Sequence, residues 1–93
     1  METDNKLALR LISLSEDQQL SVRHIGIYFA LLNLWYRNKL ESPFRITRKG
    51  VMQLARIGSI ATYHKCIADL ADRGYITYQP SYDPYKGSCI YIL

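Results

Sequence analysis

Apolar residues recur with a helical period through the middle of this chain. Between residues 20 and 41 they stand three and four positions apart, which predicts one long helix. We expect this helix to end before Pro43, because the residue that precedes a proline disfavours helical backbone. The stripe predicted to face the core consists of Ile25, Tyr28, Phe29, Leu32, Trp35 and Tyr36.

Two shorter helices are predicted next, each with a capping residue at its start. Thr47 is expected to cap a helix over residues 48–56, and Ser59 one over residues 59–73 that stops at Gly74. The inward residues of the first are Val51, Met52, Leu54 and Ala55. Those of the second are Tyr63, Cys66, Ile67 and Leu70. The outward side of the second helix keeps Ala61, Thr62, His64, Lys65 and Ala68.

Shorter patterns predict strands. Residues 44–47, "FRIT", alternate apolar and polar side chains, as a short strand does. Two β-rich runs flank "DPYKG", whose proline and glycine form turns, so residues 75–93 read as a hairpin. Residues 1–19 hold an apolar segment whose period leaves a short helix or an extended arm equally open.

The predicted order is helix, short strand, helix, turn, helix, strand, turn, strand. Ninety-three residues make one domain, residues 1–93, with a modest core. Two short helices joined by a tight turn form a helix-turn-helix, and the hairpin that follows is a wing. We therefore expect an α+β fold: a winged helix-turn-helix with a three-helix core, a C-terminal β-hairpin wing and an additional N-terminal helix or arm.

Charge is distributed unevenly along the chain. The formal net charge is +4, and no acidic residue occurs between Ser42 and Ala68. Five of the twelve Lys and Arg residues lie in that window, which leaves seven against all eight Asp and Glu elsewhere. A basic surplus in one contiguous segment is typical of a polyanion-binding surface, although a solvated basic face without a partner would show the same pattern.

The residues of this segment suggest how a duplex would be held. Arg48 and Lys49 open the second predicted helix, where the helix dipole also favours phosphate, and Arg45 and Arg56 flank them. Lys65 offers a charged donor to guanine or phosphate, and His64 can donate while neutral, although it is about as easily a plain surface residue. At the tip of the wing, Lys86 would meet the backbone and Tyr85 would pack on a sugar.

The stretch "SIATYHKCIADLADRGYI", residues 59–76, resembles the winged helix-turn-helix family of bacterial DNA-binding proteins. The wider text is similar to small winged-helix proteins of mobile elements and phages of Bacteroidetes. The resemblance implies that the 59–73 helix enters the major groove. It further implies that Ile60, Ala61, His64 and Lys65 approach the bases while Ser59 and Thr62 meet the backbone.

Other functional classes find less support. The glycines are isolated, so no phosphate-cradling loop is present, and no base and acid are spaced to activate a nucleophile. His64 and Cys66 are two apart on a helix and point to different sides, which disfavours a metal site. We expect no enzyme, no cofactor and no metal. The polar start "METDNK" and the two cysteines favour a cytoplasmic protein with reduced thiols.

The expected function is sequence-specific binding of double-stranded DNA by a bacterial transcriptional regulator. A replication or excision factor of a mobile element would use the same surface, and a winged helix can also serve as a protein-docking module without DNA. The apolar N-terminal segment and the first long helix could pair two chains into a homodimer, which would suit DNA half-sites.

Overall fold

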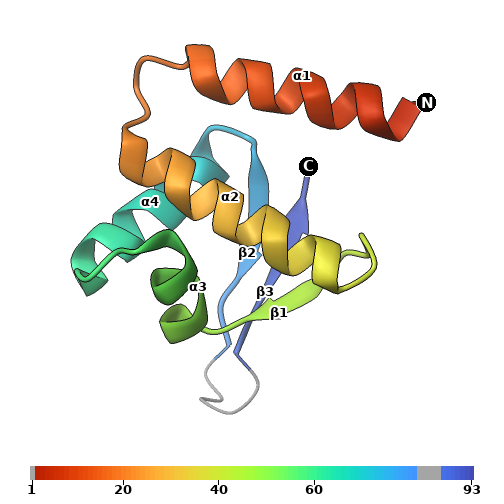
Figure 1. The fold of residues 1–93 in the computed structure, drawn as a ribbon. Helices are drawn as coiled ribbons and strands as arrows, with labels where there is room; N and C mark the ends of the chain where they lie inside the picture. The colour runs from red at the N-terminus through yellow and green to blue at the C-terminus, as the bar shows by residue number, and fades with distance from the viewer. Residues whose placement is uncertain (1, 82–86) are drawn as a thin grey trace.

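Four helices and three strands follow one another in the computed structural model of the chain, which describes residues 2–81 and 87–93, with side chains from residue 6 onward. They form an α+β fold (Figure 1). In chain order they are α1 (Glu2–Glu16), α2 (Val22–Arg37), β1 (Phe44–Ile46), α3 (Arg48–Ala55), α4 (Ile60–Asp72), β2 (Ile76–Gln79) and β3 (Ser88–Ile92).

The three strands form one antiparallel sheet in the order β1-β3-β2. Strand β3 lies in the centre, and its Ile90 is the register partner of both Phe44 in β1 and Tyr78 in β2. Ile90 is completely buried, because both neighbouring strands and the helices cover it. Strands β2 and β3 thus pair with each other within residues 75–93, the segment expected to form a hairpin. Strand β1 pairs with the other edge of β3.

Local side-chain bonds explain where the helices start. Thr47 Oγ1 accepts the N–H of Gly50 at 3.1 Å, and Ser59 Oγ accepts that of Thr62 at 3.2 Å, so both predicted caps are confirmed. Ser21 caps α2 in a capping box whose second member is His24. After α4 the chain reverses at Gly74, whose φ of +83° is readily adopted only by glycine.

The buried face of α2 differs from the predicted stripe. Phe29 and Tyr36 were expected inside but are 54 % and 73 % exposed. Tyr28 is buried as predicted, and Ile25, Leu32 and Trp35 are partly buried against the core. The other buried residues of α2 are His24, Ile27, Ala30 and Leu31. The cause is that α3, α4 and β1 all contact α2, so their positions, and not the aromatic residues, decide which side turns inward. Leu54 of α3, also expected inside, is likewise exposed.

The N-terminal segment, for which a helix and an arm were both open, is the helix α1. It crosses one end of the fold above α2 in the view of Figure 1. Its C-terminal half is fastened to the body: Leu14 is buried, and Ser13 Oγ lies 3.2 Å from the hydroxyl of Tyr75. Just after the helix, Asp17 accepts two hydrogen bonds from Arg73, at 2.6 and 2.8 Å. None of the helices in the described part of the chain is both long and apolar enough to span a membrane.

Candidate nucleic-acid interface

The surface expected to bind DNA is built around the connection between α3 and α4. Helix α3 ends at Arg56, which adopts the left-handed conformation with φ 58° and ψ 45°. The N–H of Ile57 then bonds to the carbonyl of Met52 at 2.9 Å, which satisfies one of the last carbonyls of the helix. Only Ile57 and Gly58 separate this turn from Ser59, the cap of α4. The reversal therefore sets the end of α3 directly beside the first turn of α4.

Four exposed cationic side chains lie at the termini of α2 and α3. Arg48 and Lys49 lie exposed in the first turn of α3, Arg56 is exposed at its end, and Arg23 is exposed in the first turn of α2. Within residues 6–81 and 87–93, none of these four forms an ion pair with a carboxylate. Their charge is therefore available to a ligand. Arg45 is also exposed. It lies in the middle of β1, two residues before Thr47, the cap of α3.

Sequence reasoning missed Arg23. This residue lines a surface cavity of about 410 Å³ together with Arg56 and with Ser59 and Thr62 of the first turn of α4. Arg23 precedes the acid-free window by about twenty positions and was counted among the balanced charges. The only local signal was its place just after the cap Ser21. The packing of α2 against α3 and α4 brings Arg23 to the same hollow as Arg56.

The outer side of α4 carries the predicted base-contacting residues. Ile60, Ala61, His64 and Lys65 are all exposed, and Ile60 shows 48 % of its surface. Ser59 is exposed and Thr62 is half-buried, with its N–H bonded to the cap. The opposite side packs inward, and the inward residues predicted for α4 are confirmed, each at most 2 % exposed: Tyr63, Cys66, Ile67 and Leu70. Burial raises the pKa of Tyr63 to about 12, so this phenol stays neutral in the core.

Lys65 differs from expectation because its ammonium is not free. Its Nζ lies 3.1 Å from Oδ2 of Asp69, one helical turn onward. Spacing of i,i+4 brings such a pair together on any helix, and the sequence contained this signal. The pair is weak, since Lys65 remains 73 % exposed and water competes for its charge. Lys65 can therefore reach a phosphate or a base only by leaving Asp69.

Asp69 is held from the other side by a buried histidine. His24 Nε2 lies 2.7 Å from Oδ2 of Asp69, and His24 Nδ1 accepts the backbone N–H of Ser21 at 2.9 Å. Because Nδ1 accepts this N–H, the proton of the ring sits on Nε2, which donates it to the carboxylate. The hydrogen bond from His24, followed by that from Lys65, lowers the pKa of Asp69 below its usual value. Ser21 and His24 thereby cap α2 and tie it to α4.

The predicted tip of the wing, with Tyr85 and Lys86, lies outside the described residues. What is described is its base. Gly87 has a φ of +68°, and a Cβ at this position would overlap the carbonyl oxygen of Ile46. The start of β3 is thus pressed against the end of β1, immediately before Thr47 caps α3.

Across the described residues, no three His, Cys, Asp or Glu side chains come together as a group that could hold a metal ion. Ser21, His24 and Asp69 form a hydrogen-bonded row. In this row Ser21 Oγ also accepts the N–H of Arg23 at 3.2 Å, which is the bond that a helix cap makes.

No protein-family model, curated protein or solved structure matches this chain.

Proposed function

We propose that this protein is a winged helix-turn-helix protein that binds double-stranded DNA sequence-specifically, with α4 in the major groove and the β2–β3 hairpin beside the backbone. A helix with its side chains is about 10–12 Å across, which suits the width of about 12 Å of the major groove of B-form DNA. The α+β arrangement, in which a short connection joins α3 to α4 and a hairpin follows, is compatible with this mode of binding.

One observation carries the proposal: among the described residues, four exposed cations at the termini of α2 and α3 have no carboxylate partner, and two of them share a hollow with the first turn of α4. Arg23 and Arg56 share one hollow with the N-terminus of α4, and Arg48 and Lys49 stand at the N-terminus of α3. Phosphates are favoured at such places by charge and by the unpaired N–H groups of a helix start. The backbone contacts would set the register of α4 on the duplex.

Base contacts then fall to the exposed side of α4. Ile60 and Ala61 offer apolar contact to a thymine methyl group, and His64 offers a donor or an acceptor. Lys65 would exchange Asp69 for guanine or phosphate. One copy would therefore discriminate only modestly between DNA sequences, because few polar side chains of α4 would contact the bases.

Two copies would double the recognised sequence, and we propose that the protein acts as a homodimer. Leu9 and Ile12 of α1 and Phe29 and Tyr36 of α2 are each at least half exposed, which supports pairing through these helices. Light scattering coupled to size exclusion tests this directly: a dimer should become monomeric when Ile12 is replaced by Asp. Transcriptional regulation in the cytoplasm is the role we propose for such a dimer.

The proposed DNA binding is tested by fluorescence anisotropy with mixed-sequence and selected duplexes over a salt series. Wild type should bind with a log–log salt slope that reports the phosphates contacted. The double variant Arg23→Ala/Arg56→Ala should bind more weakly and with a slope smaller by about two. Arg37→Ala is the matched control, since this exposed arginine ends α2 at the far side of the fold from α4. Absence of binding to any duplex at low salt would overturn the proposal and favour protein docking.

A further inference from the structure

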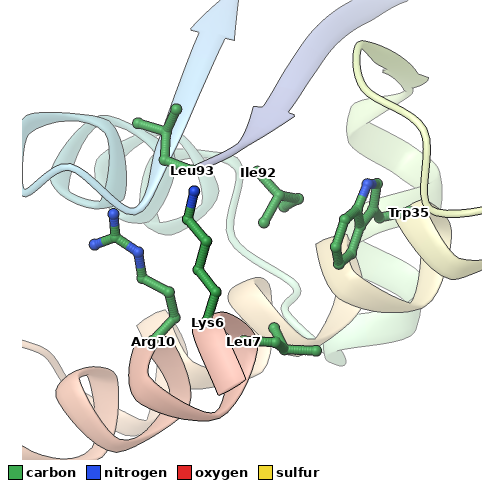
Figure 2. A pocket seen from close by; sticks show the side chains of 6 residues that line it. All are labelled: Lys6, Leu7, Arg10, Trp35, Ile92 and Leu93. Atoms are coloured by element: carbon green, nitrogen blue, oxygen red, sulfur yellow. The ribbon is translucent and has the colours of Figure 1, made fainter. Parts of the chain in front are cut away.

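A second hollow lies at the opposite part of the molecule, where α1 meets the body. It has a volume of about 240 Å³ and is lined by Lys6, Leu7, Arg10, Trp35, Ile92 and Leu93. Figure 2 shows the side chains of Leu7, Ile92 and Trp35 turned toward one another, while those of Lys6 and Arg10 rise from α1 in the same direction. The cavity thus has apolar walls from three elements and two cations from one.

The contacts described between residues 6–17 and the body lie toward the C-terminal end of α1 and just after it. Leu14, the Ser13–Tyr75 contact and the Asp17–Arg73 pair all hold the C-terminal half or the residue after it. Lys6, Leu7 and Arg10, which precede these contacts along α1, line the hollow instead. What distinguishes this hollow from the one beside α4 is its lining, which combines apolar side chains of three elements with two cations of α1.

The two cations stand one turn apart on the same helix and both line the cavity. Like charges at i,i+4 repel, and neither Lys6 nor Arg10 forms an ion pair with a carboxylate within the described residues. Arg10 has a fork of donors that fits a carboxylate in two bonds, and Lys6 adds a flexible point charge. An anion between them would replace the repulsion by two charge-assisted hydrogen bonds.

We propose that this cavity binds a small amphipathic carboxylate, with its head between Lys6 and Arg10 and its apolar part against Leu7, Trp35 and Ile92. A cavity of roughly 150 Å³ accommodates benzene, so one of this volume suits a ligand of about ten non-hydrogen atoms. Binding would add a second attachment between α1 and the body. This inference does not depend on the proposed binding of DNA, because the two sites share no residue.

Long basic side chains can also lie along apolar surface simply to cover it, with the head groups in water. The two explanations differ in what they predict for a ligand. If the basic side chains only cover apolar surface, the cavity should bind an apolar molecule equally well whatever its head group. A carboxylate site discriminates by charge, and the discrimination disappears when the cations are removed.

Trp35 is the only tryptophan of the chain and lines the cavity, so its fluorescence reports occupancy. Octanoate, which has the expected size, serves as the probe, with octanol and octylammonium as neutral and cationic counterparts and acetate as the head group alone. Octanoate should change the emission saturably and bind at least about tenfold more tightly than octanol, given two charge-assisted hydrogen bonds. Octylammonium and acetate should leave the emission unchanged.

Variants decide whether the cations are responsible. Arg10→Gln and Lys6→Gln should each weaken octanoate severalfold while leaving octanol unaffected, whereas the control Arg37→Gln should bind as wild type does. Octanoate should also raise the unfolding temperature of wild type but not of Arg10→Gln, a readout independent of fluorescence. Equal binding of octanoate and octanol, unchanged binding by Arg10→Gln, or no response of emission and unfolding temperature would each overturn the proposal.

Discussion

The ring nitrogen Nε2 of His24 lies 2.7 Å from carboxylate oxygen Oδ2 of Asp69, and this single bond joins the first turn of α2 to the outer side of α4. The same oxygen also accepts a hydrogen bond from the ammonium of Lys65. A buried residue, 6 % exposed, thereby sets the position of a side chain on the surface proposed to bind DNA. Packing of α2 on α4 and the orientation of Lys65 are consequently linked.

Replacing His24 should destabilise the protein. The substitution His24→Ala leaves the N–H of Ser21 without its acceptor and Asp69 without its buried donor, so the free energy of unfolding should fall by roughly 1–3 kcal/mol. Urea unfolding followed by circular dichroism measures this. His64→Ala is the matched control: His64 is exposed on α4, and its removal should change stability little. Equal effects of the two substitutions would show that the His24 bonds contribute nothing.

Stability should decline on the acid side for two identifiable carboxyl groups. The hydrogen bond from Arg73 lowers the pKa of Asp17, and that from His24 lowers the pKa of Asp69. Each depressed pKa contributes stability that is fully present above the usual carboxyl value of 3.8 and is lost as pH falls through the lower folded value. Urea midpoints, measured from pH 7 downward, should therefore decrease once the pH is below 3.8. They should fall less steeply in Asp17→Asn, and an identical slope would contradict this assignment.

Binding and stability should separate at Arg56. Its left-handed backbone is strained for any residue with a Cβ, so Arg56→Gly should relieve the strain and leave the free energy of unfolding within about 1 kcal/mol of wild type. The same substitution removes a guanidinium from the hollow at the start of α4 and should weaken duplex binding. Anisotropy and thermal unfolding measured on the same preparation test both parts. Unchanged affinity would remove Arg56 from the interface.

The two cysteines should differ in reactivity. Cys66 is 2 % exposed on the inner side of α4, and burial raises the pKa of its thiol, which disfavours the reactive thiolate. Cys89 in β3 is only partly buried. A chromogenic disulfide reagent should therefore modify Cys89 in the folded protein and reach Cys66 only after urea is added. The variant Cys89→Ser should be unreactive when folded, and rapid labelling of that variant would show that α4 opens readily.

Features encoded by neighbouring residues were the ones that could be read from the sequence. Thr47 and Ser59 act within their own helix turns, and Tyr63, Cys66, Ile67 and Leu70 follow the period of a helix with one buried side. The buried side of α2 was predicted wrongly at Phe29 and Tyr36, because that helix is contacted by several elements whose positions are set by tertiary packing. The pairing of β1 with β3 is likewise a contact between residues far apart in the chain.

The residues of the candidate site likewise divide into those that could be identified from the sequence and those that only the fold brings together. Arg48, Lys49 and Arg56 were identifiable as a cluster because they are close in sequence and no acid interrupts them. Arg23 comes from another helix, and only the fold brings it beside Arg56. The Lys65–Asp69 pair was visible as i,i+4 spacing, whereas the hold of His24 on Asp69 connects residues forty-five positions apart and left no local signal.

The order of strands in the sheet has a consequence for biosynthesis. Strands β1 and β2 pair only with β3, which is the last of the described elements to emerge from the ribosome. Until then their backbone groups have no partner in the sheet, and the nascent chain can form helices but no ladder. Such late closure of long-range contacts slows folding and exposes strand edges to neighbouring chains. A premature stop before Ser88 would therefore release a polypeptide prone to aggregate rather than a shortened functional protein.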